Sequence, residues 1–449
     1  MATFDGNIVV NISLDPAPVT EQNFNVVLVA GSTMGAGFTE RLRRYSNAAE
    51  AAADTDLSAA LIAEVAQAFS QRLTPKEVAI GRVDGTTAAD DYLVDGLASG
   101  AIGDTITTTV YGQSYVWTSA TGVETAGDIT DAIKIGLDAL SIPGLTVTDN
   151  GNDFNCTTAN AGQRLNVSVA VTGAATATAT QAGTGVTLYD ELGTVAAEDN
   201  DWYYVVLESR DAWDIWEAAR YTEANRNFGV FQSNDAGIIA ATTTDIAETL
   251  KDLSYSKCSI WYFSSDTTYL DTGLAANRSV VDPDLDSSTF ANVIVSGATA
   301  DDDNLTSTQK SNALGKNANL FLTNRGTAVT GNGKTPSGEW IDVVISADWL
   351  EARLGEDASN AIIAYTNRGE KIPYTDQGIN ALAALIEARL DQGVAAGHFV
   401  EDTASVNPPL LADVTAATRA ARELTIPFSV EPAGAIQFPT FNGYISLTT

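Results

Sequence analysis

The apolar residues of this chain follow two different spacings within its first 81 residues. Residues 24–30 and 77–81 are short, nearly continuous apolar runs rich in valine and isoleucine, which is typical of strands buried on both faces. Between them, Leu57 to Leu73 place apolar side chains every three or four residues, the spacing of an amphipathic helix. A buried strand, a helix and a second buried strand in this order predict a parallel βαβ unit.

The same alternation returns after residue 200. Apolar runs that predict strands alternate with amphipathic segments that predict helices, at residues 203–207, 211–226, 228–231, 245–253 and 259–263. Two further βαβ units indicate a sheet with helices on its faces. Because both parts of the chain share this style, we predict one α/β core, a mixed sheet with helices on its faces, formed by residues 21–94 and 196–425.

Between these two parts, residues 95–195 have a different composition. The segment is rich in Thr, Ala, Gly and Val and poor in Lys and Arg. Residues 106–112 and 115–117 predict a hairpin, and residues 128–140 predict a short helix. We therefore predict a small inserted domain, β-rich or α+β, that makes the core discontinuous. The Thr/Ala-rich segment also leaves open a surface or adhesive protein.

Both ends of the chain predict isolated strands. In residues 8–14 one face carries Ile8, Val10, Ile12 and Leu14, and Pro16 and Pro18 then separate this strand from the core. A lone strand cannot satisfy its own backbone and must pair with another segment. The tail is extended and apolar but is interrupted by proline, which is typical of an edge strand. We predict strand arms at 1–20 and 426–449, the second with Ile436, Phe438, Tyr444, Ile445 and Leu447 as pairing residues.

A glycine-rich run at 326–335 ends in Gly333-Lys334-Thr335 and raises the alternative of a nucleotide-binding or hydrolytic α/β enzyme. A P-loop needs a glycine five positions before Gly333, where this chain has Ala328. A P-loop also leads into a helix that holds the phosphates, whereas Trp340–Ile345 is an apolar, β-branched run that predicts a strand. A loop between two extended segments is the simpler interpretation.

The charge balance disfavours some classes of function. Lys and Arg number 24 against 57 Asp and Glu, a net charge of −33, which disfavours binding to nucleic acid or to anionic membranes. Only Cys156 and Cys258 are present, so a disulfide framework is not expected. The N-terminus lacks the cationic start of a signal peptide, and no apolar run approaches the length of a membrane span. We expect a protein made in a reducing cytoplasm.

Candidate catalytic and metal-binding residues are few. His398 is the single histidine and stands in an Ala/Gly stretch, so a surface or half-buried position is expected for it rather than a hydrolytic role. Two aspartate clusters occur in predicted loops, at 282–286 and 301–303. The first lacks the glycine and the bidentate glutamate of a calcium loop, since Ser287 and Val293 stand at those positions. We expect solvated turn acids and neither a metal nor a cofactor.

The chain resembles the tail sheath proteins of contractile phages. The resemblance depends on motifs that follow one another along nearly the whole chain: the Arg/Tyr loop 43–46, the strand 78–82, and the segments 201–204, 337–342, 371–379, 434–436 and 441–445. Residues 95–195 match least well.

This resemblance implies a structural subunit and not an enzyme. Such subunits stack as six-membered rings around a tail tube, lend their terminal strands to neighbouring subunits and contract without nucleotide hydrolysis, which drives the tube through the host envelope. The implied partners are further copies of the chain, the tube protein, and the baseplate and tail terminator or neck proteins, with no direct contact to nucleic acid or membrane. The implied location is the phage tail, after assembly in the host cytoplasm.

The resemblance also suggests where the tube is contacted. Related sheaths touch it with a helix near the C-terminus, which would be residues 411–424, with Arg419 and Arg422 as candidate contacts. Equally, both arginines are consistent with solvated residues in the last turns of a helix, where its dipole favours cations. The arms have an open alternative as well, which is pairing at a sheet edge of their own subunit.

Overall fold

The structure is a computed structural model that describes residues 19–84, 91–110, 113–142, 144–158, 165, 167–181, 187–301, 304–437 and 439. The chain divides into two compact units. We call the larger one the sheet unit; it contains Asn23–Asp282, Ser287–Ile345 and Gly434–Thr449. We call the smaller one the helical unit; it contains Met1–Gln22, Pro283–Asp286 and Ser346–Ala433.

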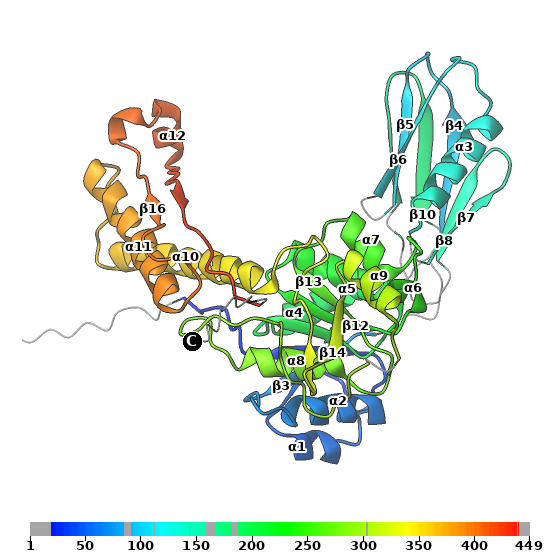
Figure 1. Cartoon of the computed structure of the whole chain (residues 1–449). Helices are drawn as coiled ribbons and strands as arrows, with labels where there is room; N and C mark the ends of the chain where they lie inside the picture. The colour runs from blue at the N-terminus through cyan, green and yellow to red at the C-terminus, as the bar shows by residue number, and fades with distance from the viewer. Residues whose placement is uncertain are drawn as a thin grey trace, which may run out of the picture. The chain divides into compact units, whose positions relative to one another are not determined.

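An eight-stranded mixed sheet forms the core of the sheet unit (Figure 1). In spatial order its strands are β15 (Thr327–Thr330), β14 (Asn319–Asn324), β13 (Cys258–Tyr262), β12 (Phe228–Ser233), β11 (Tyr204–Leu207), β1 (Val27–Gly31), β3 (Val78–Arg82) and β2 (Leu42–Tyr45). The six inner strands are parallel, and β2 and β15 are antiparallel edge strands. The pairing of β1 with β3, which places Val29 opposite Ile80, confirms the predicted parallel unit.

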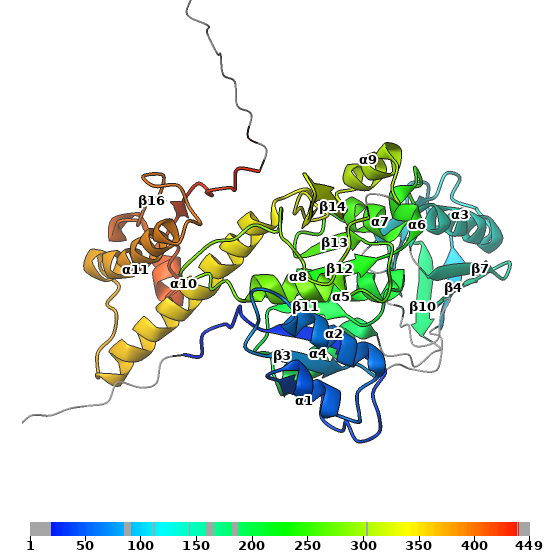
Figure 2. The ribbon, with the colours of Figure 1, turned by 60° about the horizontal axis from the view of Figure 1, so that its bottom comes forward.

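Helices cover both faces of this sheet. On one face α2 (Ala59–Phe69) packs against α8 (Leu270–Ser279) and β1, and Figure 2 shows the two helices side by side. Along the sheet, the connection from β1 leads to β3 on one side, whereas the connection from β11 leads to β12 on the opposite side. Because both connections are right-handed, the helix between β11 and β12, which is α5 (Ala212–Ala224), lies on the other face of the sheet from α2. There α5 contacts α4 (Leu188–Glu198) and α7 (Ile246–Asp252). The shorter helices are α1 (Ala48–Ala53), α6 (Ala236–Ile239) and α9 (Ser307–Gly315).

Residues 91–181 contribute no strand to this large sheet within the described ranges. They form a four-stranded antiparallel sheet of β10 (Thr176–Gln181), β4 (Asp91–Ala98), β8 (Phe154–Thr158) and β7 (Leu145–Asp149), and a three-stranded one of β6 (Gln113–Thr118), β5 (Thr105–Val110) and β9 (Val167–Val171), together with α3 (Ala126–Ala139). The predicted hairpin is confirmed as β5 and β6, in which Ile106 and Val110 are buried. The limits of an inserted domain at 95 and 195 stay a prediction.

The helical unit is formed mainly by two long helices. They are α10 (Ile341–Asn367) and α11 (Asp376–Ala395), followed by β16 (Ser405–Val406), a turn of 3-10 helix at Leu411–Asp413, α12 (Ala416–Ala421) and β17 (Phe428–Ser429). The hydroxyl of Thr375 caps α11 by accepting a hydrogen bond from the Gly378 N–H. Ile379, Ala383 and Leu390 give α11 its buried face.

Three local predictions are wrong. The predicted strand Trp340–Ile345 is the start of α10, because a short apolar run cannot by itself distinguish a strand from a buried helix end. The predicted helix 411–424 is only six residues long as α12, since Val414 and Thr415 are extended and Thr415 begins the helix as its cap. The predicted Arg/Tyr loop 43–46 belongs largely to the edge strand β2, where paired charges hold the arginines.

Candidate assembly site

The N-terminal arm was predicted at residues 1–20, and its pairing residues Ile8, Val10, Ile12 and Leu14 lie outside the described part of the chain. Where the description begins, the backbone is fixed to α10. The Val19 N–H donates to Asn360 Oδ1 at 2.8 Å, and the Gln22 N–H donates to Glu356 Oε1 at 2.7 Å. Arg353 also donates to the Gln22 carbonyl. The segment that leads to the predicted arm therefore starts from a defined point on α10.

The beginning of the predicted C-terminal arm pairs within its own subunit. β17 pairs antiparallel with β16, and the ladder continues where the Val400 N–H donates to the Glu431 carbonyl and the Ala433 N–H donates to the His398 carbonyl. Residues 427–433 therefore belong to the folded helical unit. The interpretation of 426–449 as a free arm is corrected for this part.

The sheet of β16 and β17 has two strands in the described part of the chain. The Asn407 N–H donates to the Pro427 carbonyl, so these two residues form a hydrogen-bonded pair. In an antiparallel ladder, hydrogen-bonded and non-hydrogen-bonded pairs alternate. The next pair, Val406 and Phe428, is therefore non-hydrogen-bonded, and its backbone N–H and C=O groups point to the outer edges of the sheet. The Phe428 side chain is 40% exposed. Isolated two-stranded sheets are marginally stable in water, and each of these strands has an outer edge to which another strand can add.

Further along the tail, Ile436 is 89% exposed, an unusual position for a large aliphatic side chain. The other pairing residues predicted there lie outside the described residues: Phe438, Tyr444, Ile445 and Leu447. Their role in pairing stays a prediction.

Arg419 and Arg422, predicted as tube contacts, line one pocket of about 470 Å³ in the helical unit. Lys371 adds a third cation, and Ile372, Ile379 and Leu382 supply apolar walls. The hydroxyl of Tyr374 donates to the Glu423 carbonyl at 2.6 Å, which ties the chain after α12 to the loop before α11. Arg422 ends α12 in a left-handed conformation with φ of 59°. The sequence indicated the two arginines but not the pocket, because its walls come from segments far apart in the chain.

The glycine-rich loop does not offer its amides to a ligand. The N–H groups of Gly333 and Lys334 both donate to Asn319 Oδ1, at 3.0 and 2.9 Å. The Thr335 N–H donates to the Glu339 carbonyl, and the Lys334 ammonium lies 4.8 Å from the centre of the Trp340 ring. The amides that cradle phosphates in a P-loop are thus used by the protein itself, which disfavours the nucleotide interpretation.

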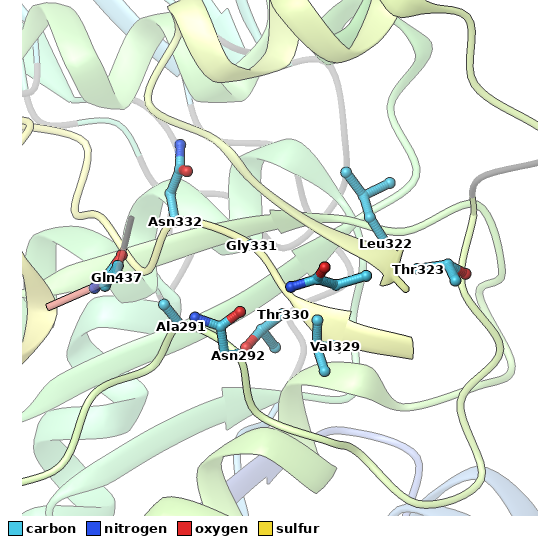
Figure 3. A pocket seen from close by; sticks show the side chains of 10 residues that line it. Ala291, Asn292, Leu322, Thr323, Val329, Thr330, Gly331, Asn332 and Gln437 are labelled. Atoms are coloured by element: carbon cyan, nitrogen blue, oxygen red, sulfur yellow. The ribbon is translucent and has the colours of Figure 1, made fainter. Parts of the chain in front are cut away.

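A pocket of about 230 Å³ lies beside this loop in the sheet unit (Figure 3). Leu322 and Val329 come from the edge pair β14 and β15, and Gln437 approaches from the tail. The Asn292 N–H donates to the Thr330 carbonyl and the Thr330 N–H donates to the Val293 carbonyl. Part of the outer edge of β15 is therefore covered by the chain itself.

His398 is buried, which corrects the expected surface or half-buried position. Its Nε2 lies 2.7 Å from the Pro283 carbonyl and must donate to it, so Nδ1 of the neutral ring accepts from the Ser346 hydroxyl at 2.7 Å. The ring stacks on Trp349 with centroids 4.7 Å apart, and burial lowers its pKa. A histidine so enclosed serves packing rather than hydrolysis.

Two of the aspartates, Asp284 and Asp301, are structural, contrary to the expectation of solvated turn acids; Asp286 is exposed as expected, and residues 302–303 lie outside the described residues. Asp284 accepts from the Arg353 guanidinium and from the Trp349 indole at 2.8 Å, and Asp301 is buried and accepts from the Ser264 N–H at 2.9 Å. Among the described residues, no group of three or more His, Cys, Asp or Glu is arranged to hold a metal ion. Over the same ranges, no helix has the length and apolar character needed to cross a membrane.

Sequence reasoning missed a buried charge cluster in the sheet unit. Arg210 donates to both carboxylate oxygens of Asp271 and lies 3.6 Å from Glu64, and both carboxylates are fully buried. Burial raises the pKa of Glu64 well above its usual range. Single residues on α2, α8 and the loop after β11 form this cluster, so no local motif indicates it.

The cluster lies near the carboxyl ends of β1 and β11, from which the chain leaves in opposite directions along the sheet. Open α/β sheets usually bind ligands at such a place. In this chain the Ser32 and Thr33 N–H groups both donate to the Glu208 carboxylate, at 3.0 and 3.2 Å. An internal carboxylate thus occupies the amides that an anionic ligand would use.

Comparison with known proteins defines the class of fold. No model of a known protein family matches the chain, and no curated protein sequence is similar to it. Solved structures do match it over their whole length: the chain has the fold of sheath tail proteins from phage-like contractile systems.

Three of these structures are similar as follows. The helical sheath of the anti-feeding prophage in its contracted state has a TM-score of 0.56 at 9% identity, with 99% of each chain covered. A chain of the contracted anti-feeding prophage baseplate has a TM-score of 0.52 at 12% identity, covering 100% of this chain and 99% of that chain. The contracted PVC sheath complex, from an extracellular contractile injection system, has a TM-score of 0.50 at 10% identity, covering 99% and 98%.

Proposed function

We propose that this chain is the subunit of a contractile sheath that polymerises as stacked six-membered rings around a tail tube, each subunit lending strands to its neighbours. The observation that carries the proposal is the β16–β17 sheet, whose outer edges face away from the ladder at Val406 and Phe428. An arriving strand adds backbone hydrogen bonds at such an edge, and its alternate side chains supply specificity. Ile8–Leu14 and Ile436–Leu447 are the strands proposed to arrive.

Head-to-tail exchange of this kind does not close on itself, so it generates a helical polymer. Contraction is then a change between two packings of subunits that remain folded, and it needs no nucleotide. The glycine-rich loop supports this part of the proposal, because its amides at Gly333 and Lys334 already bind Asn319.

Arg419 and Arg422 are proposed as contacts to an acidic tube surface, and the baseplate and terminator proteins are proposed to cap the two ends of the sheath. The acidic net charge of −33 does not oppose this arrangement, because the tube separates the sheath from the genome. In this proposal the complete particle is a phage tail or a related contractile injection device, assembled in the host cytoplasm.

The test is assembly of arm variants, observed by negative-stain electron microscopy with a purified tail tube. Deletion of residues 1–15 or 436–449 should leave a folded, soluble subunit that forms no ordered sheath. Val406→Pro should act in the same way, because it removes the outward N–H at the β16 edge. Ala416→Pro is the matched control, since proline is tolerated at the first residue of α12. Normal sheaths from either deletion would refute strand exchange.

The enzyme alternative is tested by Lys334→Ala. A sheath subunit should assemble and contract normally with this change. Loss of contraction in a variant that still assembles would favour a nucleotide-driven machine.

A further inference from the structure

The pocket of the helical unit differs in charge from the rest of the chain. Its lining contains Lys371, Arg419 and Arg422 and, among the described residues, no Asp or Glu, although acids outnumber bases 57 to 24 in the whole sequence. In the described ranges none of these three cations forms an ion pair. Three unpaired cations around one cavity attract an anionic group.

The walls require an apolar group as well. Ile372, Ile379 and Leu382 line the same cavity, whose volume of about 470 Å³ falls in the range of ordinary ligand pockets. An occupant that contacts both the cations and the apolar wall carries a large apolar side chain next to a carboxylate. A free inorganic anion would leave the apolar walls exposed to water.

The chain itself carries such a segment close to the pocket. The residues Phe4-Asp5 place an aromatic ring beside a carboxylate, and residues 1–18 contain no Lys or Arg. The described chain begins with Val19 bonded to Asn360 on α10, the helix whose Ile362 and Thr366 line the pocket. The predicted N-terminal arm therefore leaves the subunit on the same helix as the cavity.

The N-terminal segment is long enough to reach the pocket from its attachment at Val19. Residues two positions apart on a helix differ by about 200° in direction, so Ile362 faces away from Asn360. A path around the end of α10 at Asn367 joins the two faces. Seven residues of helix and one helix diameter amount to roughly 20–25 Å. At about 3.3 Å per extended residue, seven or eight residues cover this distance, and Phe4-Asp5 lies well within reach.

We propose that in the free subunit the N-terminal segment folds back and docks in this pocket, with the Phe4 ring against the apolar wall and the Asp5 carboxylate between Arg419, Arg422 and Lys371. A tethered segment has an effective concentration in the millimolar range, so the subunit's own segment competes well against that of a second copy. The inference rests on the proposed function, because its consequence concerns the arm and the tube contacts.

The docking would regulate when the N-terminal arm is available to neighbouring subunits. The docked segment covers the arginines proposed to contact the tube and keeps the strand Ile8–Leu14 away from neighbouring subunits. A tube surface that takes Arg419 and Arg422 displaces the segment and releases the strand for exchange. Polymerisation is then coupled to the presence of a tube by competition for one pocket.

The test is hydrogen–deuterium exchange, read by mass spectrometry, on the full chain at a concentration where it is monomeric. Amides of residues 4–10 should exchange at least fivefold more slowly than in a synthetic peptide of residues 1–18. Asp5→Lys alone, and Arg419→Glu with Arg422→Glu, should each bring exchange within twofold of the peptide. Combining all three changes should restore protection, because the charges are exchanged and the attraction returns. Asp15→Lys and Arg325→Glu are matched controls outside the pocket and should exchange as wild type.

Peptide-like exchange in the wild type would overturn the inference, as would protection that survives Arg419→Glu with Arg422→Glu. Protection that disappears on tenfold dilution would overturn it as well, because a second copy would then supply the segment. The assembly test separates this failure from that of the proposed function. If sheath assembly requires residues 1–15 but the segment is unprotected in the free subunit, only the docking in the pocket is refuted. If the segment is protected but assembly does not require it, only the strand exchange between subunits is refuted.

Discussion

The buried charge cluster of the sheet unit and the pocket of the helical unit hold their cations differently. In the sheet unit, Arg210 is buried against Asp271 and Glu64, and Arg220 lies over the buried carboxylate of Glu217 at 2.9 Å. In the helical unit, Arg419 and Arg422 are exposed around a pocket without a carboxylate in its lining among the described residues. The Arg210 cluster joins α2, α8 and the loop after β11, whereas unpaired exposed cations are available to a partner. The comparison predicts that charge changes in the Arg210 cluster affect mainly stability, and that charge changes at Arg419 and Arg422 affect mainly binding.

The largest effect is expected from Arg210→Ala. The change leaves the Asp271 carboxylate buried without its counterion, which typically costs about 3–5 kcal/mol of unfolding free energy. Urea denaturation followed by circular dichroism measures it. Adding Asp271→Asn should recover part of the loss, because the uncompensated charge is removed. A loss below about 1 kcal/mol for the single variant would contradict the structural role of the cluster.

His398→Ala tests whether buried hydrogen bonds stabilise the helical unit as well. The change removes the hydrogen bonds that His398 makes with the Ser346 hydroxyl and the Pro283 carbonyl, and it removes the ring from Trp349, so a loss of about 2–4 kcal/mol is expected. Thermal and urea unfolding measure the loss. Because burial lowers the pKa of His398, the unfolded chain takes up a proton first as the pH falls below about 6.5, and stability falls with it. His398→Gln should lack this acid dependence.

A smaller, pH-dependent effect is expected at Glu217. Burial raises its pKa to about 7, although Arg220 opposes the shift. The folded state then holds this proton above the ordinary pKa of 4.5, so the associated stability is present below 4.5 and is lost as the pH rises through 7. Between pH 5 and 8 the wild type should lose about 2 kcal/mol more than Glu217→Gln.

Denaturation curves at several pH values compare the two proteins, and Glu387→Gln on the exposed face of α11 is the control that should follow the wild type. Parallel pH profiles for wild type and Glu217→Gln would show that the carboxyl is not held in its protonated form.

The smallest effect on stability is expected from Arg419→Ala combined with Arg422→Ala. Both side chains are exposed and unpaired in the described structure, so the unfolding free energy should change by no more than about 0.5 kcal/mol. Urea denaturation of the double variant checks this. A loss of several kcal/mol would assign these arginines to the fold of the helical unit, and the contrast with Arg210 would disappear.

Much of the core was predictable because its signals are local. The apolar runs at Val27–Gly31 and Val78–Arg82 with an amphipathic helix between them predicted a parallel pair, and the structure confirms it. The start of α10 was not predictable, because the run Trp340–Ile345, which is apolar except for Asp342, fits a strand and a buried helix end equally well.

The candidate site was only partly indicated by sequence. Arg419 and Arg422 were identified as candidate contacts, yet the cavity they share with Lys371 and Ile379 depends on three segments that meet only in the folded unit. His398 and Asp284 were expected near solvent, because no local pattern reveals that Trp349 and Arg353 cover them. Burial of a polar residue depends on what packs over it, and the covering residues lie elsewhere in the chain.

The sequence by itself determined the alternation of buried strands and amphipathic helices, the strong negative charge, and the change of composition between residues 95 and 195, since each of these follows from spacing or from counting along the chain. Only the tertiary structure decided that β16 and β17 form a two-stranded sheet, that Glu208 occupies the loop amides at the end of β1, and that three cations surround one pocket. Pairing, burial and the sharing of a cavity are relations between distant segments, and they are fixed when the chain folds.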